Sequence, residues 1–364
     1  MLRTAARVVQ RIAVGGLLGV LAACQTLAPS SVAGTGQGPS ATVSGAALGA
    51  GTANLTPPGP TQPGAATEGA AGAAPIPAPQ APETPETAPA EPSSRPVRIG
   101  LALGGGAARG FAHVGVIKAL EARGIVPDIV VGTSVGSFVA ALYASGYDGA
   151  HLQRVAMQFE ESTLTDWSLP ARGLFKGQAL QDFVNEQVGQ RPIEKLPRKL
   201  AVVATDLHTG EMMVFERGNV GMAVRASSSV PGVFQPVTVG GREFVDGGLV
   251  SPVPARTARR LGADVVIAVD ISKKPAFQST TGAFDILLQS FNIMSSVIAR
   301  SELGDADIVL QPAVDSIGST DFAARESSIH EGEQAVAAQA DAILAVLARA
   351  RQSVAATVVP AAGP

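Results

Sequence analysis

The centre of the chain reads Ile129-Val130-Val131-Gly132-Thr133-Ser134-Val135-Gly136, and an apolar helical pattern continues from Val135 to Ala144. A short apolar run, a Gly-x-Ser-x-Gly turn and a helix are together typical of a nucleophile elbow. Such a turn holds its serine in a strained backbone conformation that projects the hydroxyl out of the sheet. Gly132 and Gly136 leave room where the strand and the helix nearly collide. The sequence therefore predicts that Ser134 is a catalytic nucleophile.

The elbow belongs to a longer alternation of strands and helices. Apolar runs predict strands at 98–103, 129–131, 200–205, 212–215, 265–269 and 308–310, and apolar spacing predicts helices at 112–123, 135–144 and 326–349. This alternation indicates an α/β domain with a mainly parallel central sheet that helices cover on both faces. Residues 147–198 are more polar, and we expect them to form a cap beside the site.

The composition excludes several classes of function. A net charge of −3, from 27 basic and 30 acidic residues, gives no electrostatic basis for binding nucleic acid. With one cysteine, four histidines and no HExxH or CxxC spacing, the chain predicts neither an internal disulfide framework nor a metal site. We expect no cofactor, and the sequence does not define an oligomeric state.

The first 24 residues predict an export signal and a lipid anchor. Basic residues precede a short apolar stretch at 12–21, which is typical of a bacterial signal peptide. Leu21-Ala22-Ala23-Cys24 resembles a lipoprotein signal-peptidase site, so we expect cleavage after residue 23 and lipidation of Cys24. The alternative is an ordinary signal peptide with a chance cysteine. We expect a location in the bacterial cell envelope, with a lipid anchor in the outer membrane on its periplasmic side or at the surface.

Residues 24–96 differ in composition from the rest of the chain. The segment 25–95 holds 13 of the 26 prolines and no Phe, Tyr or Trp. It cannot bury enough apolar area to offset the entropy of ordering, so we expect a disordered tether. We place the catalytic domain at 97–350 and a flexible tail at 351–364.

Two further motifs provide parts that an activated serine needs. The loop Gly104-Gly105-Gly106-Ala107-Ala108-Arg109-Gly110 allows backbone N–H groups to converge on a developing oxyanion. It lacks the Gly-Lys-Ser/Thr ending of a P-loop, and Arg109 replaces the third glycine of a dinucleotide fingerprint. Asp246-Gly247-Gly248 predicts a tight turn that presents a carboxylate at a strand end. Taken alone, the glycines are compatible with close helix–strand packing, and Asp246 with a surface turn.

In combination and in this order, the motifs resemble the patatin-like phospholipases, most of all the bacterial esterase branch related to neuropathy target esterase. The resemblance covers about residues 97–350 and implies a three-layer α/β/α patatin-like fold. Val135 and Ser137 replace alanines that are usual in the family. The matching segments are 101–110, Ala112-His113-Val114-Gly115-Val116, Gly132-Thr133-Ser134-Val135-Gly136-Ser137, Ala204-Thr205-Asp206-Leu207, 225–234 and Asp246-Gly247-Gly248.

The resemblance implies a Ser–Asp dyad that releases fatty acids from phospholipids or other acyl-ester lipids. Ser134 would attack the ester carbonyl, and Asp246 would accept its proton, with Gly247 and Gly248 shaping the turn after the aspartate. A carboxylate is a weaker base than imidazole and works best when partly desolvated, because its pKa then rises.

The resemblance also assigns the oxyanion hole to the glycine loop. The hole would be formed by Gly104, Gly105 and Gly106, with the N–H groups of Gly105 and Gly106 binding the oxyanion. Arg109 would fix the loop.

Histidine offers an alternative base. A triad in the order Ser, Asp, His would use His330, but only about two strands fit between residue 97 and Ser134, fewer than an α/β-hydrolase places before its elbow. We expect structural or surface roles for His113, His151 and His208. We also expect Ser227-Ser228-Ser229 to pack or cap a helix, and Asp206 to shape a turn.

Three functions remain open from the sequence. The first is hydrolysis of phospholipid, lysophospholipid or neutral glycerolipid esters near a membrane. The second is lipid binding without catalysis, by an envelope lipoprotein on an enzyme scaffold. The third is acyl transfer to an acceptor other than water.

Overall fold

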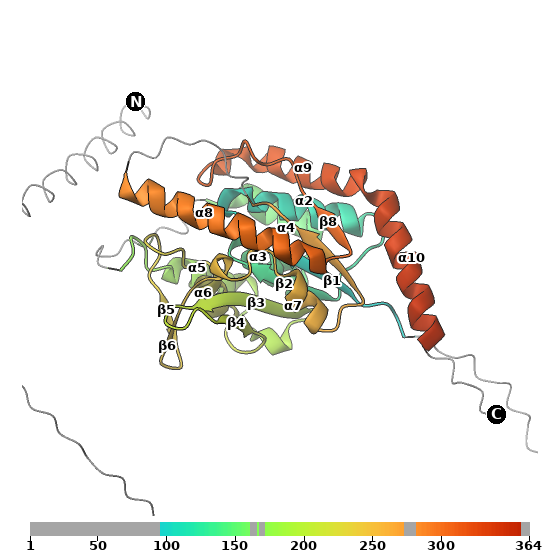
Figure 1. Ribbon diagram of the computed structural model, residues 1–364, viewed down its shortest axis with the longest axis horizontal. Coiled ribbons are helices and arrows are strands. Elements are labelled where there is room, and N and C mark those ends of the chain that lie inside the picture. The colour runs from blue at the N-terminus through green and yellow to red at the C-terminus, as the bar shows by residue number, and fades with distance from the viewer. Residues whose placement is uncertain (1–94, 161–165, 167–171, 273–281, 358–364) are drawn as a thin grey trace, which may run out of the picture. The chain divides into compact units, whose positions relative to one another are not determined.

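A sheet of eight strands organises the chain around the elbow (Figure 1). The computed structural model describes residues 95–160, 166, 172–272 and 282–357, all of which belong to one compact unit. The predicted signal peptide, Cys24 and the tether up to residue 94 lie outside these residues. Among the described helices, none combines the length and apolarity needed to span a membrane.

The secondary structure alternates between strands and helices along most of the chain. The strands are β1 (Ile99–Leu103), β2 (Ile129–Thr133), β3 (Lys199–Asp206), β4 (Met212–Phe215), β5 (Val237–Val239), β6 (Arg242–Asp246), β7 (Val265–Val269) and β8 (Ile308–Leu310). The helices are α2 (Phe111–Glu121), α3 (Val135–Ala144), α4 (Gly149–Gln158), α5 (Gln178–Gln187), α6 (Val220–Ser227), α7 (Ala255–Arg260), α8 (Ala283–Glu302), α9 (Arg325–Ala338) and α10 (Ala340–Thr357).

Five neighbouring strands of the sheet are parallel, in the order β3, β2, β1, β7 and β8. β4 and β6 both pair antiparallel with β3, and β5 pairs antiparallel with β6. β2 pairs with β3 as far as Val203, and β6 pairs with β3 from Ala204 onward. A Cβ added to Gly247, just after β6, would meet Thr133 Cγ2 at 3.1 Å. The end of β6 therefore lies next to the end of β2.

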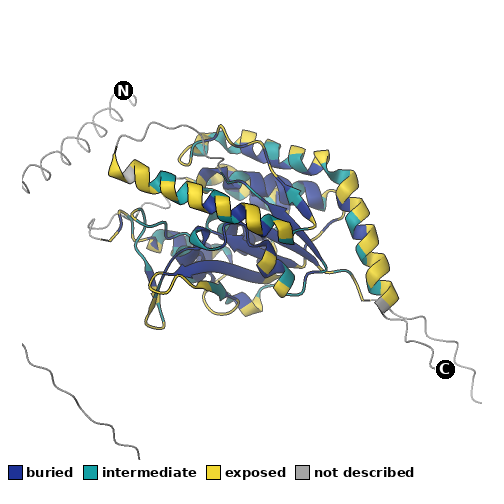
Figure 2. Ribbon diagram, viewed as in Figure 1, coloured by how far each residue is buried: buried dark blue, intermediate teal, exposed yellow. Residues whose placement is uncertain are grey.

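Helices cover both faces of this sheet, as the sequence predicts. Successive strand residues point to opposite faces, so the core is divided in two. On one face Leu101 and Val202 pack in a cluster with residues of α2, α3, α4, α5, α6 and α9. On the other face Ala102 and Val203 pack with residues of α7 and with Ala299 of α8. Figure 2 shows the central strands buried along their length, which agrees with their uninterrupted apolar sequences.

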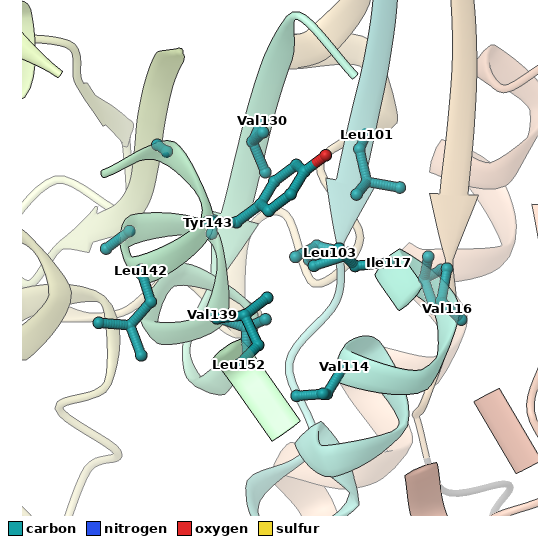
Figure 3. Close-up of a cluster of buried hydrophobic side chains, with 14 of the residues drawn as sticks. Leu101, Leu103, Val114, Val116, Ile117, Val130, Val139, Leu142, Tyr143 and Leu152 are labelled. Atoms are coloured by element: carbon teal, nitrogen blue, oxygen red, sulfur yellow. The ribbon is translucent and has the colours of Figure 1, made fainter. Parts of the chain in front are cut away.

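The larger core fixes the helix that follows the elbow. All residues of α3 except Val135 and Phe138 are buried. In Figure 3 the ring of Tyr143 lies between α3 and the strands, close to Val130 and pointing toward Leu101. This packing holds α3 against the sheet and so holds the position of the turn at its N-terminus.

A second helix contact supports the glycine loop. α2 and α9 lie side by side (Figure 1), and their backbones approach closely at two glycines. A Cβ on Gly332 would collide with the carbonyl oxygen of Ala112, and one on Gly115 with that of Ile329. α2 starts directly after the glycine loop, so the packing of α9 on α2 also stabilises the position of the loop.

Several sequence predictions need correction. The helix predicted at 326–349 is two helices, because the chain turns at Gln339 (φ −116°, ψ 15°). α10 continues to Thr357, seven residues into the predicted flexible tail, through a segment without Gly or Pro. In the described part of 147–198, where the sequence predicts a cap beside the site, Leu152 of α4 and Val184 of α5 belong to the main core.

Candidate active site

Ser134 occupies a strained turn between β2 and α3. Its backbone has φ 53° and ψ −128°, a conformation that residues with a Cβ rarely adopt. Gly132 and Gly136 are required here, because a Cβ on Gly132 would collide with Gly136 and one on Gly136 with the carbonyl oxygen of Leu103. A serine at a helix N-cap usually accepts a hydrogen bond from the first turn, but the Ser134 side chain accepts none. Its hydroxyl is therefore not used to cap α3.

Ser227 links the strained turn at Ser134 to β3 through two hydrogen bonds. Its buried hydroxyl donates to Val203 O on β3 at 2.5 Å and accepts the N–H of Ser134 at 2.8 Å. Two residues later, Ser229 O accepts the N–H of Asp246 at 3.0 Å. The segment after α6 thus contacts both members of the predicted dyad. The serine run is visible in the sequence, but its contact with Ser134 depends on the packing of α6 against β3.

Asp246 ends β6 beside the elbow and is only 1% exposed. Its Oδ1 accepts the N–H of Gly248 at 2.7 Å, which is the tight turn predicted from Asp-Gly-Gly. Thr205 Oγ1 donates to the carbonyl oxygen of Asp246 at 2.8 Å. Oδ2 forms no hydrogen bond of normal geometry in the described part of the chain. One carboxylate oxygen is thus fixed and the other is available.

The environment of Asp246 gives it the properties of a base. Burial raises the pKa of this carboxyl to about 6, because desolvation disfavours its charged form. The N–H of Gly248 and the hydroxyl of Ser134 both interact with the carboxylate and lower its pKa by less than burial raises it. A pKa near 6 allows the group to be ionised at neutral pH and still to be a useful proton acceptor.

The glycine loop lies against the elbow, but its donors differ from the prediction. A Cβ on Gly105 would meet Ser134 Cβ at 3.3 Å. However, Gly104 N–H donates to Val269 O and Gly105 N–H donates to Pro252 O, each at 3.0 Å. The prediction that Gly105 supplies an oxyanion N–H is therefore wrong in this structure, and Gly104 has no free N–H either. Among the described residues, the N–H groups of Gly106 and Ala107 have no such partner.

Two buried side chains hold the loop in place. His113 Nε2 donates to Gly104 O at 2.8 Å, and burial lowers the pKa of His113 to about 4, so the ring is neutral. Arg109 is 3% exposed, and its Nε donates to Ile271 O at 2.9 Å, which ties the loop to the residues after β7. Burial also lowers the pKa of Arg109, opposed by the nearby Asp315 and Asp270. Both side chains therefore hold the glycine loop against its neighbours.

The remaining predicted residues lie outside the dyad. His330 is exposed on α9, with its Nε2 3.4 Å from Gln334 Nε2, so the alternative triad is not assembled. His208 pairs with Glu243 at 3.2 Å, and His151 stacks on Tyr147. In the described segments, no group of three His, Cys, Asp or Glu side chains could hold a metal ion.

Asp206 shapes its turn, as expected. Its Oδ1 accepts the N–H groups of His208 and Thr209, each at 2.9 Å, and its Oδ2 accepts Arg242 Nε at 2.7 Å. These bonds, the one from Thr209 above all, lower the pKa of Asp206 to about 2. The group is a permanently charged turn former and not a base.

Known proteins resemble this chain over the region that contains the site. Residues 101–259 match the family model described as patatin-like phospholipase. An uncharacterized NTE family protein of Mycobacterium tuberculosis is 40% identical over 186 residues, which are 50% of this chain and 51% of that protein. Patatin-like phospholipase domain-containing protein 6 of Mus musculus is 35% identical over 184 residues, 48% of this chain and 14% of the mouse protein.

A second NTE family protein of Mycobacterium tuberculosis is 31% identical over 267 residues, 66% of this chain and 46% of that protein. The chain thus spans about half the length of these mycobacterial relatives. Among solved structures, VipD from Legionella pneumophila aligns with a TM-score of 0.44 and 16% identity, over 70% of this chain and 68% of VipD. With its elbow, its glycine loop and a mainly parallel sheet between two helical layers, the region at residues 101–259 is similar to the patatin-like phospholipases.

Proposed function

We propose that this chain is a serine acyl hydrolase in which Ser134 is the nucleophile and Asp246 is the base. One observation carries the proposal. A buried carboxylate with a pKa of about 6 interacts with the hydroxyl of a serine that stands on a strained elbow. A serine hydroxyl needs a neighbouring base to become a useful nucleophile, and no histidine of the described chain forms a hydrogen bond or ion pair with either residue.

The two residues are sufficient for a complete cycle. Ser134 Oγ attacks the carbonyl carbon of an ester while Asp246 takes the hydroxyl proton. The tetrahedral intermediate collapses, and the alcohol leaves with the proton that Asp246 returns. Asp246 then takes a proton from water, the resulting hydroxide attacks the acyl-enzyme, and Ser134 leaves with that proton as the fatty acid is released.

The oxyanion is held by backbone N–H groups near Ser134. Gly106 and Ala107 offer two N–H groups without partners in the described chain. The first turn of α3 offers the N–H groups of Val135 and Gly136, which Ser134 does not cap. The N–H of the residue after the nucleophile is a common member of such sites, so Val135 and Gly106 are our leading candidates.

The substrates we propose are esters of fatty acids in phospholipids, lysophospholipids or neutral glycerolipids. The match of residues 101–259 to the patatin-like phospholipase family model supports this choice. We further propose that the chain is a lipoprotein of the cell envelope, anchored through Cys24, which would keep the site near such lipids. The motif at residues 21–24 supports this part of the proposal.

A fluorophosphonate probe tests the nucleophile. We expect the full-length protein to be labelled and Ser134→Ala to remain unlabelled, because the probe phosphonylates only an activated serine. Ser145→Ala is the matched control, since it removes a serine from the other end of α3, where the hydroxyl bonds only Leu142 O. Continued labelling of Ser134→Ala with an unchanged circular dichroism spectrum would disprove the assignment. Asp246→Asn should be folded and should hydrolyse p-nitrophenyl butanoate at least a hundredfold more slowly.

A further inference from the structure

Ser134 lies in one of the few partly exposed stretches between the start of β2 and the end of α3. Between Ile129 and Ala144, only Ser134, Val135 and Phe138 are not fully buried. Phe138 follows Ser134 by one helical turn, and its N–H donates to Ser134 O at 3.3 Å. Residues four apart lie on the same side of a helix. The neighbours of the nucleophile on its open side are therefore apolar.

Phe138 begins a row of five packed aromatic rings. It stacks on Phe183 of α5 at 6.0 Å between ring centroids and meets Phe159, after α4, edge to face at 5.9 Å. Phe159 also contacts Phe183 at 5.7 Å and Phe322 at 6.4 Å. Phe322 contacts Phe111, the first residue of α2, at 6.2 Å. We call these five residues the phenylalanine row.

The row returns to the glycine loop. Phe111 follows Gly110, and a Cβ on Gly110 would collide with the Val135 side chain. One end of the row is therefore Phe138 on α3. The other end, Phe111, follows Gly110, which lies beside Val135, the residue next to the nucleophile. Three α-helices, the residue after α4 and the short 3-10 helix Phe322–Ala324 contribute one ring each, although they are far apart in the sequence.

The phenylalanine row is partly exposed to solvent, and neighbouring groups hold its rings in place. Each of its five residues is half-buried, whereas a phenylalanine that serves only the core, such as Phe244, is 1% exposed. Arg325 holds it from behind: its guanidinium lies 5.7 Å from the Phe111 ring and donates to Phe159 O at 2.9 Å and Met157 O at 3.0 Å. In a chain with only 12 phenylalanines, five in one half-exposed row beside the nucleophile need an explanation beyond core packing.

We propose that the phenylalanine row is the binding surface for the acyl chain of the substrate. This inference rests on the proposed hydrolase function and adds its preference for long fatty acyl groups. When the ester carbonyl lies at Ser134, its acyl chain lies beside Val135 and Phe138. Each added methylene group is then transferred from water to the faces of the aromatic rings. Every buried methylene strengthens binding by a roughly constant factor, so the row selects long acyl chains over short ones.

Chain-length dependence of ester hydrolysis tests the inference. The full-length protein is assayed with p-nitrophenyl butanoate and p-nitrophenyl dodecanoate, and the ratio of the two kcat/KM values is the readout. We expect the ratio to exceed one in the wild type and to fall about tenfold in Phe183→Ala, because the long ester alone reaches this ring. Phe183→Leu keeps most of the apolar volume and should give an intermediate ratio. Leu344→Ala, an exposed apolar residue on α10, is the control and should leave the ratio unchanged.

The possible results separate this inference from the proposed function. Hydrolysis of both esters by the wild type, with the same ratio in Phe183→Ala, would overturn the role of the row and leave the hydrolase intact. Absence of hydrolysis in the wild type, or hydrolysis by Ser134→Ala, would overturn the proposed function itself. Because the ratio is measured within each variant, a loss of folded protein does not alter it, and Phe183→Leu replaces Phe183→Ala if the latter does not fold.

Discussion

At the scale of single residues, the site depends on unfavourable conformations and environments that neighbouring groups maintain. Ser134 has a positive φ and is held by Ser227, and Asp246 is a carboxylate with almost no access to water. Either feature alone lowers stability. In the proposed mechanism, their combination gives a weak nucleophile and a weak base the reactivity that ester cleavage requires.

The pKa of Asp246 predicts opposite effects of pH on activity and stability. The base must be ionised, so kcat/KM for a soluble ester should rise as pH increases through about 6 and then level off. Stability changes the other way. Folding raises the pKa from 3.8 to about 6, so the folded protein favours the protonated carboxyl. The contribution of the protonated Asp246 carboxyl to the free energy of unfolding is complete below pH 3.8 and is lost as pH rises through 6.

Asp246→Asn isolates this effect, because asparagine cannot ionise. The variant should be more stable than the wild type at pH 8, by up to about 3 kcal/mol, and the difference should disappear near pH 4. Urea unfolding at both pH values measures it. Burial raises the pKa of Glu302 to about 7, but Glu302 is present in both proteins. Its contribution to the pH dependence of stability therefore cancels in the comparison. Equal stability at pH 8 would show that Asp246 is not desolvated.

The sequence indicates the proposed nucleophile and base more clearly than it indicates the groups that contact them. Ser134 and Asp246 are recognisable because their turns are local and demand glycines at fixed positions. Gly105 was assigned wrongly because its N–H is taken by Pro252, which lies far along the chain. Ser227 was seen only as part of a serine run, since its bond to Ser134 requires knowing how α6 meets β2 and β3.

At the scale of elements, α2 connects the outer helical layer to the glycine loop. Its inner face carries His113, which donates to Gly104 O, and its outer face packs on α9. Gly115 and Gly332 allow the two helix backbones to approach closely. The loop is thus held at its start by β1 and along its length by a helix pair.

Gly332→Ala tests this connection. The added Cβ would collide with the carbonyl oxygen of Ala112, and a backbone atom cannot move aside without shifting α2. We expect a loss of about 2 kcal/mol in unfolding free energy and a loss of ester hydrolysis that exceeds the loss of folded protein. Gly304→Ala is the matched control, since no atom lies within 4 Å of its Cβ position, and it should be neutral. Thermal unfolding and kcat per folded molecule are the measurements; a neutral Gly332→Ala would show that α9 does not position the loop.

Element prediction succeeded where the local pattern is complete. The buried strands β1, β2 and β7 were found because they are uninterrupted apolar runs, and α3 was predicted with its observed limits. The antiparallel strand β5 was not predicted, since its three residues Val-Thr-Val form neither an uninterrupted apolar run, as in β8, nor a long enough alternation. The break between α9 and α10 was also missed, because the sequence around Gln339 contains no Gly or Pro to mark it.

At the scale of the whole molecule, the proposed anchor and the proposed substrate agree with each other. Lipid esters are presented by membranes, and two or more acyl chains on one residue would hold a protein there firmly. Cys24 is the only cysteine of the chain. An anchored protein meets lipid substrates at the high local concentration of a membrane surface. Turnover therefore does not require a large pocket that binds the head group tightly.

Metabolic labelling tests the anchor, provided that the catalytic serine is removed first. A hydrolase of this kind forms an acyl-enzyme, and an alkyne fatty acid on Ser134 would resemble lipidation of Cys24. In bacteria that express the full chain, Ser134→Ala should therefore still incorporate alkyne palmitate and partition into detergent. The double variant Ser134→Ala/Cys24→Ser should incorporate none, because it offers no thiol for the lipid. Label that persists in the double variant, or that is absent from Ser134→Ala, would mean that the cysteine after residue 23 is a chance feature of an ordinary signal peptide.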